Sequence, residues 1–378
     1  MTVVGFGILL IWWAWRSDLL WFERHVLPNY CVSSDRDLRA VSTLRWAGAT
    51  AGAILVFGAG PFLGRWTARR TTRELVFFAV VCTIAVVAAL VASEILMRRI
   101  YADAMAKRDG WIRDVPAYRC GDPNYACGWA APQTKDVTVA SRPVTYAINA
   151  EGNRARTAAE VSDPSLPTIL VVGESIGFGH AVRYEESFAG LLEHDLGIQT
   201  VNLSVSGFGP TQQYMRLLEV LPRYTNPVVV VIVFVPMGIP RDNFVDRPHM
   251  ELRNDGTLEL LPATTGLKIA LMVNNEPYRG NGPLETTRAV LRATAAAVRA
   301  RGARPLFLIT NFGPACLPDE GLSTPWFVHE LFEREALPYV LVQYGADETP
   351  TEIEIHPNAA VHRRFADAIE RALRVPER

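Results

Sequence analysis

Apolar residues are distributed unevenly along the chain, and most of the excess lies near its start. Three long apolar segments, 2–15, 46–63 and 75–97, occur there. The last of these has one charged residue, Glu94, and no polar face. Because a helix needs about 20 apolar residues to cross a bilayer, we predict two or three transmembrane helices within residues 1–97. The alternative is buried helices of a soluble domain, and the first segment is short for a crossing.

From residue 167 onward, apolar runs typical of strands alternate with amphipathic stretches typical of helices. The runs are Thr168–Val172, Gln199–Leu203, Val228–Val235, Pro305–Ile309 and Tyr339–Val342. The third run is apolar at every position, as in a parallel strand that is buried on both faces. The alternation predicts a three-layer α/β/α, flavodoxin-like domain over 167–378, with a mainly parallel five-stranded sheet. Met250–Leu261 alternates across Asn-Asp-Gly and predicts a β-hairpin beside the site.

Residues 98–166 show neither pattern for long. A turn-rich segment is followed by an extended run at Arg142–Asn149, so we predict a tether and lead-in before the α/β domain. Cys120 and Cys127 flank a Gly-Asp-Pro-Asn turn. That spacing is compatible with a small disulfide loop in an oxidising compartment and equally with two free thiols.

Charge and motif content narrow the range of partners. The net charge is −1 and no basic stripe is visible, so we expect no nucleic-acid partner. No metal-ligand spacing occurs, so we expect no metal and no cofactor. Four arginines at 65–73 favour a cytoplasmic loop, whereas basic residues at 98–108 argue the opposite orientation. We favour a multi-pass protein of the cytoplasmic membrane with its C-terminal domain outside.

Ser175 lies on the turn between the first strand of the α/β domain and a helix. A serine there has its hydroxyl at the mouth of the sheet, where backbone N–H groups stabilise a developing oxyanion. His356 is available to activate it. The segment 173–177 matches GxSxG, but that α/β-hydrolase elbow follows several earlier strands, which Ser175 does not. The plainer alternatives are a helix-capping serine and a surface-loop histidine.

Four motifs in order resemble the SGNH/GDSL hydrolase superfamily over about 200 residues. They are Gly173-Glu174-Ser175, Asn202–Pro210, Val235–Asn243 and Glu354–Asn358, preceded by a lead-in at Tyr146–Arg154 that is similar to the one in membrane-anchored members. The resemblance implies the SGNH hydrolase fold for residues 167–378 and an acyl-serine mechanism.

The resemblance also implies a role for each site residue. Ser175 is the expected nucleophile, His356 the general base and Glu354 the acid that orients the imidazole. The N–H groups of Ser175 and Gly207 are the expected oxyanion hole. Substrate contacts are expected from Asn243 and His180, whereas His362, on the last helix, is expected to be structural.

Two features depart from the family pattern. Gly238 stands where the third motif usually has an asparagine, and losing one oxyanion donor typically costs about 10²–10³ in rate. We therefore add the Gly238 N–H to the expected hole, or the Asn243 amide in its place. At 174 and 354, Glu replaces the usual Asp, which keeps the charge and adds a methylene.

The implied function is hydrolysis of O-acyl esters, with acetyl the expected group, on an envelope glycan or lipid-linked sugar, with envelope-modification proteins as partners. Two alternatives remain open. An O-acyltransferase would use the same triad with a sugar hydroxyl in place of water. A catalytically degenerate domain would bind glycan or act as a scaffold. A soluble cytoplasmic lipase would follow if the apolar segments did not enter a membrane.

Overall fold

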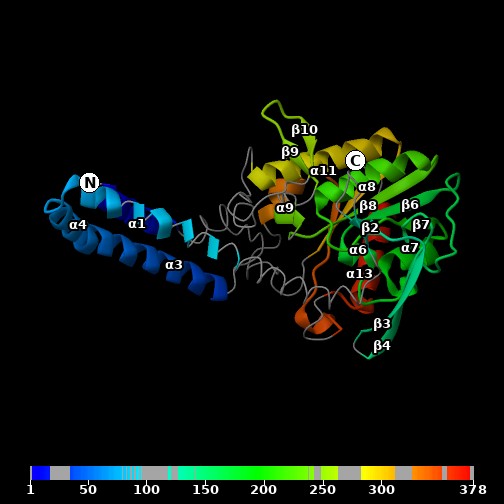
Figure 1. Cartoon of the computed structure of the whole chain (residues 1–378). Helices are drawn as coiled ribbons and strands as arrows, with labels where there is room; N and C mark the ends of the chain where they lie inside the picture. The colour runs from blue at the N-terminus through cyan, green and yellow to red at the C-terminus, as the bar shows by residue number, and fades with distance from the viewer. Residues whose placement is uncertain are drawn as a thin grey trace. The chain divides into compact units, whose positions relative to one another are not determined.

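The computed structural model describes two compact units, one made of N-terminal helices and one built around a sheet (Figure 1). The described residues are 2–17, 35–78, 80–81, 83–85, 87–88, 91–92, 95, 118–120, 127–139, 141–236, 238–241, 248–262, 282–310, 326–350 and 356–374.

Closely packed apolar helices form the N-terminal unit. They are α1 (Thr2–Arg16), α3 (Asp35–Ala53), the π-helix η1 (Ile54–Ala59) and α4 (Gly60–Thr67). Glycines let α1 and α3 approach each other, because a Cβ at Gly52 would lie 2.6 Å from the carbonyl oxygen of Gly7. Close contact through small residues is the packing mode that membrane helices use.

One helical stretch in the described part of the chain is long and apolar enough to cross a membrane. It runs from Val41 to Thr67, contains the expected span 46–63, and is 6% buried in its most apolar window. The helix α1 is shorter, with 15 residues. The expected span 75–97 lies partly outside the described residues. A crossing by more than one helix therefore stays a prediction.

The second unit contains a mostly parallel sheet with the order β12-β11-β8-β6-β7-β5-β4-β3. The five parallel strands occur where the apolar runs predict them: β6 (Thr168–Val172), β7 (Gln199–Asn202), β8 (Pro227–Phe234), β11 (Arg304–Ile309) and β12 (Tyr339–Leu341). β6 lies at the centre, paired with β7 on one side and β8 on the other.

Three antiparallel strands enlarge this sheet beyond the five that we expected. They are β3 (Gln133–Val139), β4 (Arg142–Ile148) and β5 (Arg154–Ala155). β5 pairs with β7, and β4 pairs with β5. The predicted extended run at 142–149 corresponds to β4, and part of the segment expected as tether and lead-in thus joins the sheet. Val144, Tyr146 and Ile148 alternate along β4 and are buried, which gives the hairpin its own core.

A separate pair, β1 (Tyr118–Cys120) and β2 (Cys127–Trp129), precedes these strands. The antiparallel register places the backbone of Cys120 opposite that of Cys127. This register is compatible with both alternatives, a disulfide and two free thiols.

Alternate residues of β6 enter two separate cores, and this creates the three layers. Ile169 and Val171 pack with the helices α7 (Phe188–Leu196) and α13 (Ala359–Arg374). Leu170 and Val172 pack on the other face with α8 (Pro210–Val220), α11 (Gly282–Ala300), α12 (Trp326–Val328) and the π-helix η5 (His329–Glu333). The expected α/β/α layering is confirmed.

The expected hairpin is also present, as β9 (His249–Leu252) and β10 (Leu258–Leu261) beside α11 (Figure 1). Its Met250 packs with Met215 of α8 and Val290 of α11. The remaining elements are short: α6 (Ser175–Phe178), η2 (Tyr184–Glu186), η3 (Leu221–Arg223), α9 (Gly238–Arg241) and η6 (Ala346–Glu348).

Candidate active site

Ser175 is the first residue of α6, three residues beyond the end of β6. Gly173 permits the turn, because a Cβ there would lie 2.8 Å from the Cβ of Val233 on the neighbouring strand. The side chain of Glu174 caps α6 by accepting the N–H of Ile176 at 3.1 Å. The local sequence thus places the serine at the carboxyl end of the central strand, as expected.

The second motif runs beside the first in a fixed register. The chain leaving β7 continues the ladder, with Leu203 N–H donating to the Val171 carbonyl at 2.7 Å and Val205 N–H to the Gly173 carbonyl at 3.1 Å. Ser175 and Gly207 each lie two residues beyond the last pair. Gly207 has φ of +84°, a left-handed conformation that favours glycine. The ladder therefore runs up to the segment that carries Gly207, and the pairing of the Ser175 and Gly207 N–H groups in one oxyanion hole stays a prediction.

Asn202 contributes a contact that the sequence did not predict. Its Nδ2 donates to the Gly177 carbonyl at 2.8 Å, and its Oδ1 accepts the N–H of Ser204 at 3.0 Å. The side chain is fully buried. Asn202 therefore ties the nucleophile helix α6 to the second motif, and its place in that motif is the signal that pointed to it.

Gly238 has a structural role. Its N–H donates to the Val235 carbonyl at 2.8 Å. The N–H that we expected in the oxyanion hole is therefore already used within the turn. A Cβ at this position would lie 3.0 Å from Cδ of Pro210. The glycine thus allows the end of β8 to approach the start of α8. Because its N–H is already used, Gly238 is not among the oxyanion donors that we propose. Asn243 lies outside the described residues.

His356 reaches the nucleophile region through His180. The two imidazole rings lie with their centroids 4.3 Å apart at an interplanar angle of 45°, and both residues are 2% exposed. The backbone N–H of His180 donates to the Ser175 carbonyl at 3.0 Å. His356 is therefore a buried histidine packed on His180, and its role as the base for Ser175 stays a prediction. Glu354 lies outside the described residues, so its role as the third member stays a prediction.

The hydroxyl of Ser175 has a partner that was not expected. Its Oγ donates to Oε2 of Glu174 at 2.6 Å, and both residues are buried. Sequence reasoning noted only that Glu replaces Asp at this position. The replacement of Asp by Glu at position 174 does not by itself predict that the carboxylate accepts a hydrogen bond from Ser175.

His362 packs in the core between α13 and α7, consistent with the structural role expected for it. Its Nδ1 accepts the N–H of Phe188 at 3.3 Å, and its ring stacks on that of Phe188 with centroids 6.0 Å apart. Burial, with a smaller contribution from His356, lowers the pKa of His362 to about 3. The residue is therefore a neutral acceptor in the folded protein.

The low pKa of His362 predicts acid sensitivity of the fold. Folded His362 binds a proton near pH 3 and the unfolded chain near 6.5. Between these pH values the unfolded state binds more protons than the folded state. The contribution of neutral His362 to the free energy of unfolding is therefore complete above pH 6.5 and decreases on acidification. We expect a loss of about 2 kcal/mol by pH 5. Chemical denaturation at pH 7.5 and 5 should show a smaller loss of stability in His362→Gln than in the wild type. Equal losses in the two proteins would contradict the assignment of the low pKa to His362.

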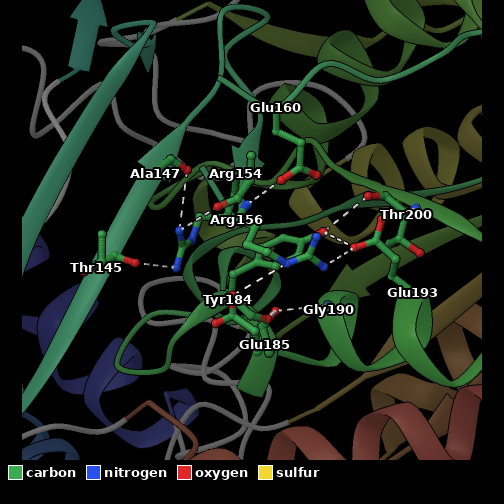
Figure 2. Close-up of polar contacts among 12 residues, drawn as sticks. Thr145, Ala147, Arg154, Arg156, Glu160, Tyr184, Glu185, Gly190, Glu193 and Thr200 are labelled. Carbon is green, nitrogen blue, oxygen red and sulfur yellow. Dashed lines mark hydrogen bonds and ion pairs between the residues drawn. The ribbon is translucent and has the colours of Figure 1, made fainter. Parts of the chain in front are cut away.

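A buried arginine packs against Phe178 of α6. The guanidinium of Arg154 lies over the rings of Tyr146, Phe178 and Tyr184, at 5.0, 5.2 and 5.9 Å from their centroids. Figure 2 shows Arg154 near Tyr184 and Thr145. It donates to the carbonyl oxygens of Thr145 and Ala155, each at 3.1 Å. Burial lowers its pKa to about 10. The lead-in motif was noted in the sequence, but this role was not predicted.

In the described part of the chain, no group of three or more His, Cys, Asp or Glu side chains is placed to hold a metal ion.

Comparison with known proteins gives structural neighbours but no sequence match. No family model and no curated protein matches the chain. TesA is 19% identical, over 55% of this chain and 98% of its own, with a TM-score of 0.33. A lipolytic protein of the G-D-S-L family from Desulfitobacterium hafniense is 14% identical, over 54% and 98%, with a TM-score of 0.34. The esterase EstA from Pseudoalteromonas is 17% identical, over 55% and 96%, with a TM-score of 0.33. The solved structures to which this chain is similar are thus GDSL-type esterases and lipolytic proteins, and at these scores the likeness assigns no activity.

Proposed function

We propose that the chain is a membrane-anchored serine esterase of the SGNH type. One arrangement supports the proposal. Ser175 begins α6 beyond the carboxyl end of the central strand β6, and the buried ring of His356 lies 4.3 Å from that of His180, whose N–H donates to the Ser175 carbonyl. A serine, a base and backbone donors that meet at a sheet edge are what acyl transfer through a covalent intermediate needs.

In the proposed mechanism, Ser175 Oγ attacks the ester carbonyl while His356 takes the hydroxyl proton. The N–H groups of Ser175 and Gly207 stabilise the oxyanion of the tetrahedral intermediate. His356 then gives the proton to the leaving alcohol, and an acyl-serine remains. Water, activated by the same histidine, releases the acid. Glu354 would hold the imidazole in the required tautomer.

The proposed substrates are O-acyl, chiefly acetyl, esters on an envelope glycan or a lipid-linked sugar. Apolar side chains of the N-terminal unit support a membrane location, since Trp46 is 72% and Phe57 79% exposed. Exposed apolar surface of this extent is suited to lipid. The substrate class and an extracytoplasmic position rest on the resemblance of the motifs to tethered family members. Transfer to a sugar hydroxyl instead of water would need the same residues.

A second candidate function is a non-catalytic domain that binds glycan or organises envelope proteins. The third motif supports it, because the usual asparagine is missing and the Gly238 N–H is used within its own turn. The hole then has two backbone donors, from Ser175 and Gly207.

Turnover and labelling of the full chain in detergent test the proposal. We expect hydrolysis of p-nitrophenyl acetate and covalent capture of a fluorophosphonate probe, with the modified residue mapped to Ser175 by mass spectrometry. Ser175→Ala should remove both signals. Labelling without turnover would favour a transferase that lacks its acceptor. Neither signal, in protein with native circular dichroism, would favour the binding domain.

A further inference from the structure

We propose that Glu174 is a latch on the nucleophile: in the resting site it holds the Ser175 hydroxyl, which must be released before His356 can activate it. The proposal rests on the esterase function and concerns the regulation of that same site. It starts from the 2.6 Å hydrogen bond from Ser175 Oγ to Oε2 of Glu174. A hydroxyl has one proton to donate, so this bond keeps the proton from a histidine base.

The surroundings of Glu174 make the bond persistent. Both carboxylate oxygens accept the N–H of Ile176 at 3.1 Å, which fixes the side chain under the turn. Glu174 is fully buried and Ser175 is 4% exposed, so little water competes for either group. A hydrogen bond from a hydroxyl to a carboxylate is about twice as strong as one between neutral groups. The resting orientation of Oγ is therefore held by the protein itself.

The side-chain length at position 174 separates capping from latching. Aspartate is a good helix cap and retains the negative charge, so Glu174→Asp keeps the bond to Ile176. One methylene fewer withdraws the carboxylate from Oγ. Glutamine keeps the length but replaces the charged acceptor by a neutral one, which weakens the hold on the hydroxyl.

The latch predicts a gain of reactivity in both variants. When the competent orientation is only fractionally populated, the observed rate is reduced by that fraction. We expect the rate of fluorophosphonate labelling at Ser175 to rise about tenfold in Glu174→Asp and Glu174→Gln, which corresponds to about 1.4 kcal/mol. A residue that only supports the turn would lower the rate on substitution and never raise it.

The experiment measures labelling rates at Ser175 in the detergent-solubilised full chain for wild type, both variants and Ser175→Ala, with circular dichroism and thermal melting as controls for folding. Faster labelling in both variants supports the latch. Unchanged labelling overturns it and leaves the esterase proposal intact. Loss of labelling in both folded variants also overturns it and makes Glu174 the base. Absence of Ser175 labelling in every protein overturns the latch together with the esterase function.

Discussion

Replacing His356 by alanine is expected to lower p-nitrophenyl acetate hydrolysis about 10²–10⁴-fold, the usual contribution of a general base. The His356 imidazole is buried against the ring of His180 and is the expected proton acceptor for Ser175. Because the two residues act as one unit, the double variant with Ser175→Ala should be no slower than the slower single variant. Steady-state rates of the four proteins measure this.

His194→Gln is the matched control for the His356 variant. His194 lies on α7, its side chain is 85% exposed, and its Nδ1 contacts Asp195 at the surface. Its replacement should leave the rate unchanged. Full activity in His356→Ala would remove the histidine from the mechanism and make Glu174, which accepts the hydrogen bond from Oγ, the next candidate for the proton acceptor.

Arg154→Ala is expected to destabilise the sheet-containing unit by about 3–5 kcal/mol. The substitution removes a side chain that fills the space among Tyr146, Phe178 and Tyr184, and it leaves buried carbonyl groups of β4 and β5 without their donor. Burial of the charge costs free energy, as the lowered pKa of Arg154 shows, so part of this loss is offset. Urea denaturation followed by tryptophan fluorescence measures the difference.

Arg156→Ala serves as the control for Arg154, two residues away. Arg156 pairs with Glu193 at 2.8 Å, but its side chain is 48% exposed, and exposed ion pairs contribute about 0–1 kcal/mol (Figure 2). Similar losses in the two variants would mean that charge, and not packing beneath α6, determines the effect.

The sequence was sufficient for the parallel core. A buried parallel strand is an uninterrupted apolar run in the sequence, so β8 and its neighbours could be located to within one residue at each end. Motif order then predicted which loops meet, since the carboxyl ends of parallel strands share one edge. Ser175 lies at this edge for that reason, and a common site with Gly207 and His356 stays a prediction.

Side-chain partners and non-local pairing were beyond the sequence. β5 has only two residues, and its partner β7 is distant in the sequence. No local sequence pattern therefore predicts β5. The bond from Ser175 to Glu174 depends on a rotamer, and the bond that occupies the Gly238 N–H depends on the path of one turn. Arginine is seldom fully buried, so the residue type alone would have placed Arg154 at the surface.

The three antiparallel strands have a practical consequence for the isolated domain. A fragment cut at the motif boundary, residue 167, would lose β3, β4 and β5 together and leave the outer backbone of β7 exposed. An unprotected strand edge is a template for intermolecular β-pairing and aggregation. Loss of solubility in such a fragment would then result from the absence of β3, β4 and β5. It would give no information about the serine site.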